Sequence, residues 1–117
     1  MARTQIPVTA VAETGTSQPA VTNGDATNDH YIAGGSDLVV ECKNTSGGAL
    51  DATFVTSYAT SGGIGLEDNV VNVGAGATKL VKLVGSSTRR LYEQSGDSNR
   101  IYVNVTSNSW EFRAYGL

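Results

Sequence analysis

Hydrophobic and polar residues alternate along several short stretches of this chain, which is the pattern of β-strands that bury one face. The alternation is clearest in residues 38–44, 101–106 and 110–115. Every second side chain of a strand points to the same side, so stretches with matching parity can share one core. This parity predicts a core formed by Leu38, Val40, Cys42, Phe54, Val103, Val105, Trp110 and Phe112.

Glycine-rich connectors between these stretches predict β-hairpins. Gly47 and Gly48 lie between 38–44 and a second β-rich stretch, 51–58. Glycine adopts the positive φ angles of tight turns at little cost, so the pair favours a turn that folds one strand onto the other. We expect this first hairpin to form the centre of an antiparallel sheet.

A second hairpin is predicted further along the chain, where residues 74–77 join 70–73 to 78–84. The stretch 78–84 does not alternate cleanly. We therefore expect it either to carry a bulge or to lie between two layers.

Shorter strands are predicted at 30–32 and 91–92, a turn at 95–99, and no helix. Seven or eight closely spaced strands predict an all-β domain over 29–117. Its expected architecture is an antiparallel β-sandwich of jelly-roll type or a small barrel.

Residues 1–28 differ from the rest, because 13–28 contain almost nothing large enough to bury. Ile6 and Val8 nevertheless sit at strand spacing, and Pro7 confines such a strand to a sheet edge. We expect an extended N-terminal arm that is mobile in the isolated protein and becomes ordered on a neighbouring subunit. A disordered tail is the alternative.

Six residues are candidates for an interface with a partner. Two lie in the arm, two are the apolar residues of a glycine-rich loop over 59–69, and two are adjacent arginines. The loop residues either tuck under the sheet or form a hydrophobic tip, and the arginines either contact a partner or stay solvated. The candidates are Ile6, Val8, Ile64, Leu66, Arg89 and Arg90.

Length and composition indicate one domain of 117 residues with few charges and a net charge of −3. This charge provides no strong field for binding nucleic acid or an anionic membrane. No apolar run approaches the ~20 residues that span a bilayer, and we expect no signal peptide. Cys42 is the only cysteine, so no internal disulfide forms, which fits assembly in a reducing cytoplasm.

The motifs of common enzymes are missing, so we expect no catalysis and no cofactor. His30 is the only histidine, and no Gly-x-Ser-x-Gly elbow accompanies it. The glycines of 62–65 lack the lysine and helix of a phosphate loop. One cysteine and one histidine cannot complete a zinc site.

Two weaker signals leave alternatives open. Asp25, Asp29 and His30 are close in sequence and are residue types that bind a metal, or they are polar loop residues that face water. The five tyrosines either line a sugar-binding face or pack against the sheets; they are Tyr31, Tyr58, Tyr92, Tyr102 and Tyr115.

With these motifs laid out, the chain resembles small β-rich virion proteins of tailed bacteriophages, in particular head decoration (cement) proteins. The resemblance spans nearly the whole chain, from the opening residues 2–9 to the closing strands. Between them it rests on 40–45, 52–55, the turn 73–78 and Tyr92-Glu93-Gln94.

The resemblance implies a structural virion protein that decorates a phage capsid and stabilises it by binding between capsid subunits. Its expected partners are the major capsid protein and copies of itself, with a trimer as the first expectation. It implies a location on the capsid surface after synthesis in the host cytoplasm.

Two other functions compete with this one. A carbohydrate-binding or adhesion β-sandwich would be favoured by three coplanar, exposed aromatic rings. Another small virion part, such as a connector, tail or fibre protein, is also compatible with the resemblance. An enzyme would require a deep pocket with carboxylates around His30.

Overall fold

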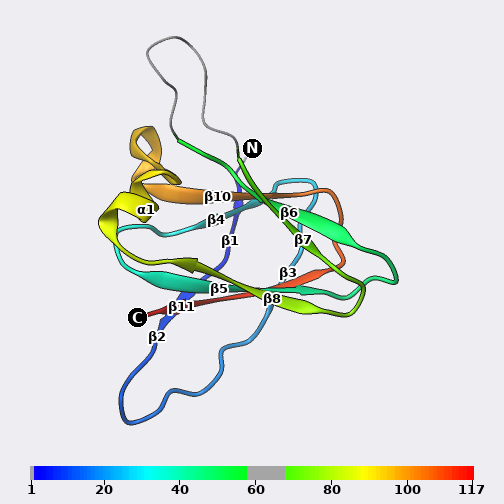
Figure 1. Cartoon of the computed structure of the whole chain (residues 1–117), viewed down its shortest axis with the longest axis horizontal. Helices are drawn as coiled ribbons and strands as arrows, with labels where there is room; N and C mark the ends of the chain where they lie inside the picture. Colours follow the sequence, from blue (N-terminus) through cyan, green and yellow to red (C-terminus); the bar gives the residue numbers. More distant parts are fainter. Residues whose placement is uncertain (1, 58–67) are drawn as a thin grey trace.

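The computed structural model describes residues 2–57 and 68–117, which form two β-sheets around one hydrophobic core (Figure 1). The elements in chain order are β1 (Thr4–Gln5), β2 (Val8–Ala10), β3 (Thr22–Asn23), β4 (His30–Ile32), β5 (Leu38–Asn44), β6 (Leu50–Phe54), β7 (Asn69–Val73), β8 (Thr78–Leu83), α1 (Ser86–Arg90), β9 (Glu93–Gln94), the 3-10 helix η1 (Ser95–Asp97), β10 (Arg100–Val105) and β11 (Trp110–Gly116).

Both sheets are mixed. The six-stranded sheet, here sheet A, has the order β1-β4-β10-β6-β7, with β9 beside β10. The five-stranded sheet B has the order β2-β11-β5-β8, with β3 beside β11. Strands β1 and β2 pair in parallel, with β4 and β11 respectively, and the other pairings are antiparallel. The prediction of a β-rich fold is therefore confirmed, but the sheets are not purely antiparallel.

The core lies between the sheets and follows the parity of the sequence. All eight residues predicted for it are buried. Phe112 is fully buried, and its ring stacks on Trp110 at a centroid distance of 5.4 Å. Since the alternation fixes which side of each strand is apolar, the side-chain parity of β5, β10 and β11 could be predicted without knowing the strand partners.

The first predicted hairpin is wrong, because its two strands belong to different sheets. Strand β5 lies between β11 and β8 in sheet B, whereas β6 lies between β10 and β7 in sheet A. Both edges of β5 are occupied, so the connector crosses from one sheet to the other. Buried Asn44 fixes this crossing: its Nδ2 donates to the carbonyls of Gly48 at 2.7 Å and Val73 at 2.9 Å.

The second predicted hairpin is wrong for the same reason, since β7 belongs to sheet A and β8 to sheet B. The predicted turn does form, and the Ala77 amide donates to the Gly74 carbonyl at 3.0 Å. Strand β8 is an edge strand of sheet B and pairs with β5 in continuous register. It therefore has no bulge against β5, and it does not lie between two layers. Its irregular pattern arises because Leu80 lies on the outside and is 66% exposed.

The described residues contain one short α-helix that the sequence did not predict. Helix α1 precedes Leu91 and Tyr92, which were expected to form a strand. Ion pairs hold the helix in place, because Arg89 lies 3.0 Å from Asp37 and 3.6 Å from Glu93. The predicted turn that follows does form, as η1 and two residues with positive φ.

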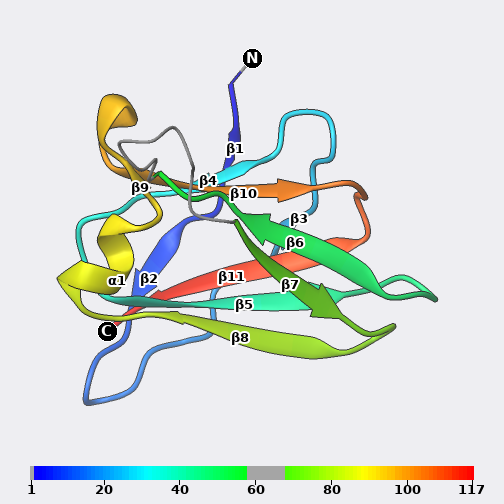
Figure 2. The ribbon, with the colours of Figure 1, turned by 45° about the horizontal axis from the view of Figure 1, so that its top comes forward.

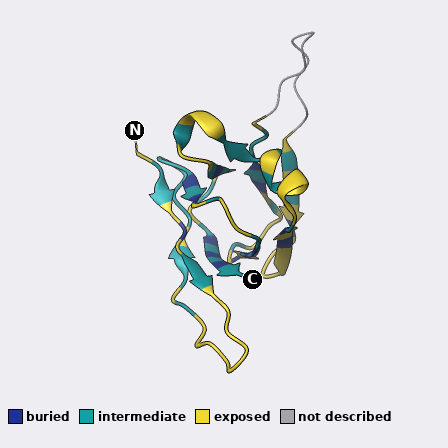
Figure 3. Ribbon diagram, turned by 90° about the vertical axis from the view of Figure 1, so that its left-hand side faces the viewer, coloured by how far each residue is buried: buried dark blue, intermediate teal, exposed yellow. Residues whose placement is uncertain are grey.

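The N-terminal segment, residues 2–10, lies along both sheets of its own chain (Figure 2). It pairs with β4 through β1 and with β11 through β2. Ile6 lies between these strands, is fully buried in the common core, and donates its amide to the Tyr31 carbonyl at 2.9 Å. Residues 11–18 then form an exposed loop (Figure 3).

The burial of Ile6 predicts that Ile6→Ala destabilises the isolated protein by about 2–5 kcal/mol, because the truncation leaves a cavity in the core. The control is Val11→Ala, at a position that is 50% exposed, which should change stability by less than about 0.5 kcal/mol. Urea denaturation of both variants measures the difference. Equal effects of the two substitutions would show that the segment is not packed in the isolated chain.

Candidate functional site

His30 lies inside the protein and connects the N-terminal segment to the turn that precedes β4. Its side chain is fully buried, with the ring edge-on to Phe112 at a centroid distance of 5.1 Å. The Asp25 amide donates to Nε2 at 2.9 Å, and Nδ1 lies 3.2 Å from the Thr4 carbonyl. Because Nε2 accepts a hydrogen bond, Nδ1 carries the proton and donates to Thr4. The imidazole is therefore neutral.

The carboxylates of Asp25 and Asp29 accept hydrogen bonds from the protein itself. The Asp25 carboxylate accepts from the Thr4 hydroxyl at 2.6 Å and from the Asn28 amide at 3.0 Å. These bonds to Thr4 and Asn28 lower the pKa of Asp25 from 3.8 to about 2. Asp29 Oδ1 accepts the Val105 amide at 2.9 Å. Within residues 2–57 and 68–117, no three His, Cys, Asp or Glu side chains gather as a metal site would require.

Arg3 completes what we call the N-terminal clamp: Arg3, Thr4, Asp25, His30 and Asn104. Its guanidinium donates to Asn104 Oδ1 at 2.6 Å and to the His30 carbonyl at 3.1 Å. It also lies 3.9 Å from the centre of the Tyr102 ring, in a cation–π contact. The clamp fixes the start of the chain to the outer face of sheet A.

The outer face of sheet A carries two of the tyrosines. Tyr31 and Tyr102 are opposite each other on β4 and β10, and Arg100 covers Tyr31 at 4.2 Å just as Arg3 covers Tyr102. Tyr115 belongs to sheet B, Tyr92 packs against the core, and Tyr58 lies outside the described residues. Among the described tyrosines, therefore, no three form an open aromatic platform.

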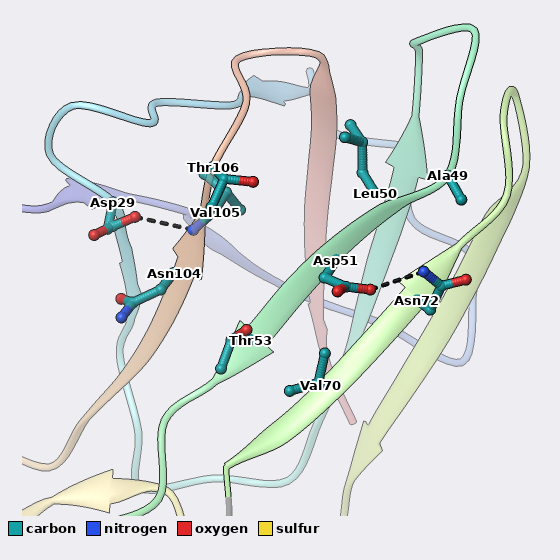
Figure 4. A pocket seen from close by; sticks show the side chains of 10 residues that line it. All are labelled: Asp29, Ala49, Leu50, Asp51, Thr53, Val70, Asn72, Asn104, Val105 and Thr106. Atoms are coloured by element: carbon teal, nitrogen blue, oxygen red, sulfur yellow. Dashed lines mark hydrogen bonds between the residues drawn. The ribbon is translucent and has the colours of Figure 1, made fainter.

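A groove of about 580 Å³ lies on the same face (Figure 4). Its apolar lining includes Leu50 and Val70, and Val70 is 55% exposed. The Asp51 carboxylate accepts from Asn72 Nδ2 at 2.8 Å, which orders the β6–β7 side of the groove. The polar lining comes from β6, β7 and β10, from the residue before β4 and from the residue after β10. These polar residues are Asp51, Thr53, Asn72, Asn104, Asp29 and Thr106.

The structure places the predicted interface residues in different environments. Ile6 is in the core, and Val8 is half-buried and packs against that core. Ile64 and Leu66 lie outside the described residues. On α1, Arg89 takes part in the ion pairs with Asp37 and Glu93, while Arg90 is exposed.

The alternating pattern of β10 predicts that Tyr102 and Asn104 point outward, which is correct. It does not indicate that these two residues contribute to the clamp or the groove. Arg3 has no sequence signal that links it to Asn104, because the two residues are 101 positions apart.

The chain matches no protein family model, no curated protein and no solved structure. Within the described part of the chain, no helix is long and apolar enough to cross a membrane.

The clamp predicts that stability decreases on acidification. Burial lowers the pKa of His30 below its ordinary value of 6.5, so the folded protein keeps the imidazole neutral. As pH falls through about 6.5, the unfolded chain takes up a proton that the folded chain resists, and the free energy of unfolding decreases. A second loss of stability follows as the pH falls from 3.8 towards about 2. In this range Asp25 becomes protonated, and its carboxylate no longer accepts the hydrogen bonds from Thr4 and Asn28.

Urea denaturation between about pH 8 and pH 5 isolates the histidine effect. His30→Gln is the control, because glutamine does not titrate there; its stability should be lower than that of wild type but flat across the range. A flat wild-type profile, or an equal slope in His30→Gln, would contradict the assignment.

Proposed function

We propose that this protein is a structural component of a bacteriophage virion that decorates the capsid and stabilises it by binding between capsid subunits. The sequence resemblance to head decoration proteins supports the proposal. Its partners are then the major capsid protein and further copies of this chain, with a trimer as the first arrangement to test. The capsid surface is its location.

The observation that carries the proposal is a body whose two sheets are joined by the N-terminal segment and whose sheet A has an outer face that is exposed along β6 and β7. Ile6 holds this segment in the core between the sheets, and Arg3 holds it on the outer face of sheet A. A body fixed in this way can bind across a junction between capsid subunits and add interface area there. Expansion of the capsid would have to break that added area, which is how a bound protein stabilises an assembly.

The finer description of the fold belongs to the same proposal. Every pairing among β4, β5, β6, β7, β8, β10 and β11 is antiparallel. We take these strands as an antiparallel sandwich of jelly-roll type, to which the N-terminal segment adds two parallel edge strands.

Binding to undecorated capsids of the phage that encodes the chain tests the proposal. We expect the purified protein to co-sediment with such capsids at a fixed number of copies. It should also raise their melting temperature, and cryo-electron microscopy should show it at junctions between capsid subunits. Failure to co-sediment at concentrations of about 10 μM, or binding without a change in capsid melting, would contradict the proposed role.

A further inference from the structure

We infer that the groove on sheet A docks an extended basic segment of the capsid protein, with an arginine or lysine side chain placed against Asp51. This inference rests on the proposed function for the identity of the partner.

The face is open to a partner in the described part of the chain. Asp51, Val70 and Asn72 are exposed and point outward from the neighbouring strands β6 and β7 (Figure 4). A volume of about 580 Å³ falls within the range of pockets that hold a small ligand or a few side chains of a peptide.

The charges of the groove favour a cation. Asp29 and Asp51 line it, and neither takes part in an ion pair among the described residues. No lysine or arginine lines it. A phosphate or other anion would therefore meet two carboxylates, whereas a guanidinium or ammonium group would be attracted to them.

The protein already binds one guanidinium beside the groove. Arg3 donates to Asn104, one of the lining residues, and its flat face covers Tyr102. On the other side of β6 the groove offers a carboxylate, that of Asp51, in place of the amide oxygen and carbonyl that hold Arg3. There, Asn72 occupies Oδ1 of Asp51, which leaves Oδ2 for an incoming donor.

The apolar lining fits the rest of such a side chain. Val70 lies opposite Thr53 on the neighbouring strand β7, on the same exposed face as Asp51, and can contact the methylene stem of an arginine or lysine while its charged end reaches the carboxylate. The hydroxyl of Thr53, on the same strand as Asp51, can accept a further hydrogen bond. A basic residue next to an apolar one in an extended partner segment would satisfy both parts of the groove.

A matched pair of charge reversals tests the inference on capsids. Asp51→Lys and Glu13→Lys each change the net charge from −3 to −1, but Glu13 lies in the exposed loop 11–18, away from the groove lining. We expect Asp51→Lys to weaken capsid binding at least 10-fold and Glu13→Lys to change it less than about 2-fold, with similar melting temperatures for both variants. Equal binding by the two variants would overturn the inference while leaving the decoration role intact.

A capsid-free measurement separates the groove from the proposed function. In NMR titrations of the isolated protein, an acetylated, amidated Arg-Val-Arg peptide should shift the amide signals of Thr53 and Asn72 in wild type but not in Asp51→Lys. The same titrations include Glu-Val-Glu and maltotriose as acidic and neutral probes. Shifts produced by maltotriose and not by the basic peptide would make the groove a carbohydrate site. No shift with the basic peptide would overturn the inference, whatever the capsids show.

Discussion

The burial of Ile6 between the two sheets is the contact on which the docking of the N-terminal segment depends. It anchors a segment that supplies an edge strand to each sheet, through β1 on β4 and β2 on β11. Fixing each residue of such a segment costs roughly 1–2 kcal/mol of conformational entropy. Strand pairing, the buried side chain of Ile6 and the hydrogen bonds of Arg3 and Thr4 together offset that cost. The segment also covers strand edges that could otherwise pair with another chain.

The two sheets are further linked where the chain crosses between them. Asn44 is important here, because its side chain bonds to both connectors: to Gly48 after β5 and to Val73 before the turn into β8. A buried amide of this kind satisfies backbone carbonyls that would be costly to leave unpaired. A few long-range contacts therefore link the sheets, the connectors and the N-terminal segment: those of Ile6, Asn44 and His30.

The sequence predicts the local features of this fold better than its long-range pairings. Parity along β5, β10 and β11 gave the buried faces correctly, because alternation is a property of each strand alone. The connector 74–77 forms the predicted turn, whereas Gly47 and Gly48 lie in a bend and do not adopt positive φ. Neither connector indicates the sheet to which the next strand belongs, because a turn does not determine strand partners. The helix α1 was missed, since it is held by the distant Asp37 rather than by a helical pattern of its own.

The candidate site was predictable only in part. The outward residues of β10, β6 and β7 follow from the same parity, but their assembly into one groove depends on strand order. His30 was read as a polar loop residue or a metal ligand, whereas it is buried against Phe112 and bound by backbone groups from two segments. Thr4 and Phe112 come from the N-terminal segment and from β11, and no local pattern near His30 indicates them; only Asp25 is close to His30 in the sequence.

Hydrogen exchange of the Ile6 amide tests the central claim most directly. This amide donates to the Tyr31 carbonyl, so its exchange reports whether the N-terminal segment is docked on its own chain. In the isolated protein at neutral pH, the account predicts protection of Ile6 similar to that of the β10 amides. Exchange as fast as that of the exposed residues 11–18 would contradict it.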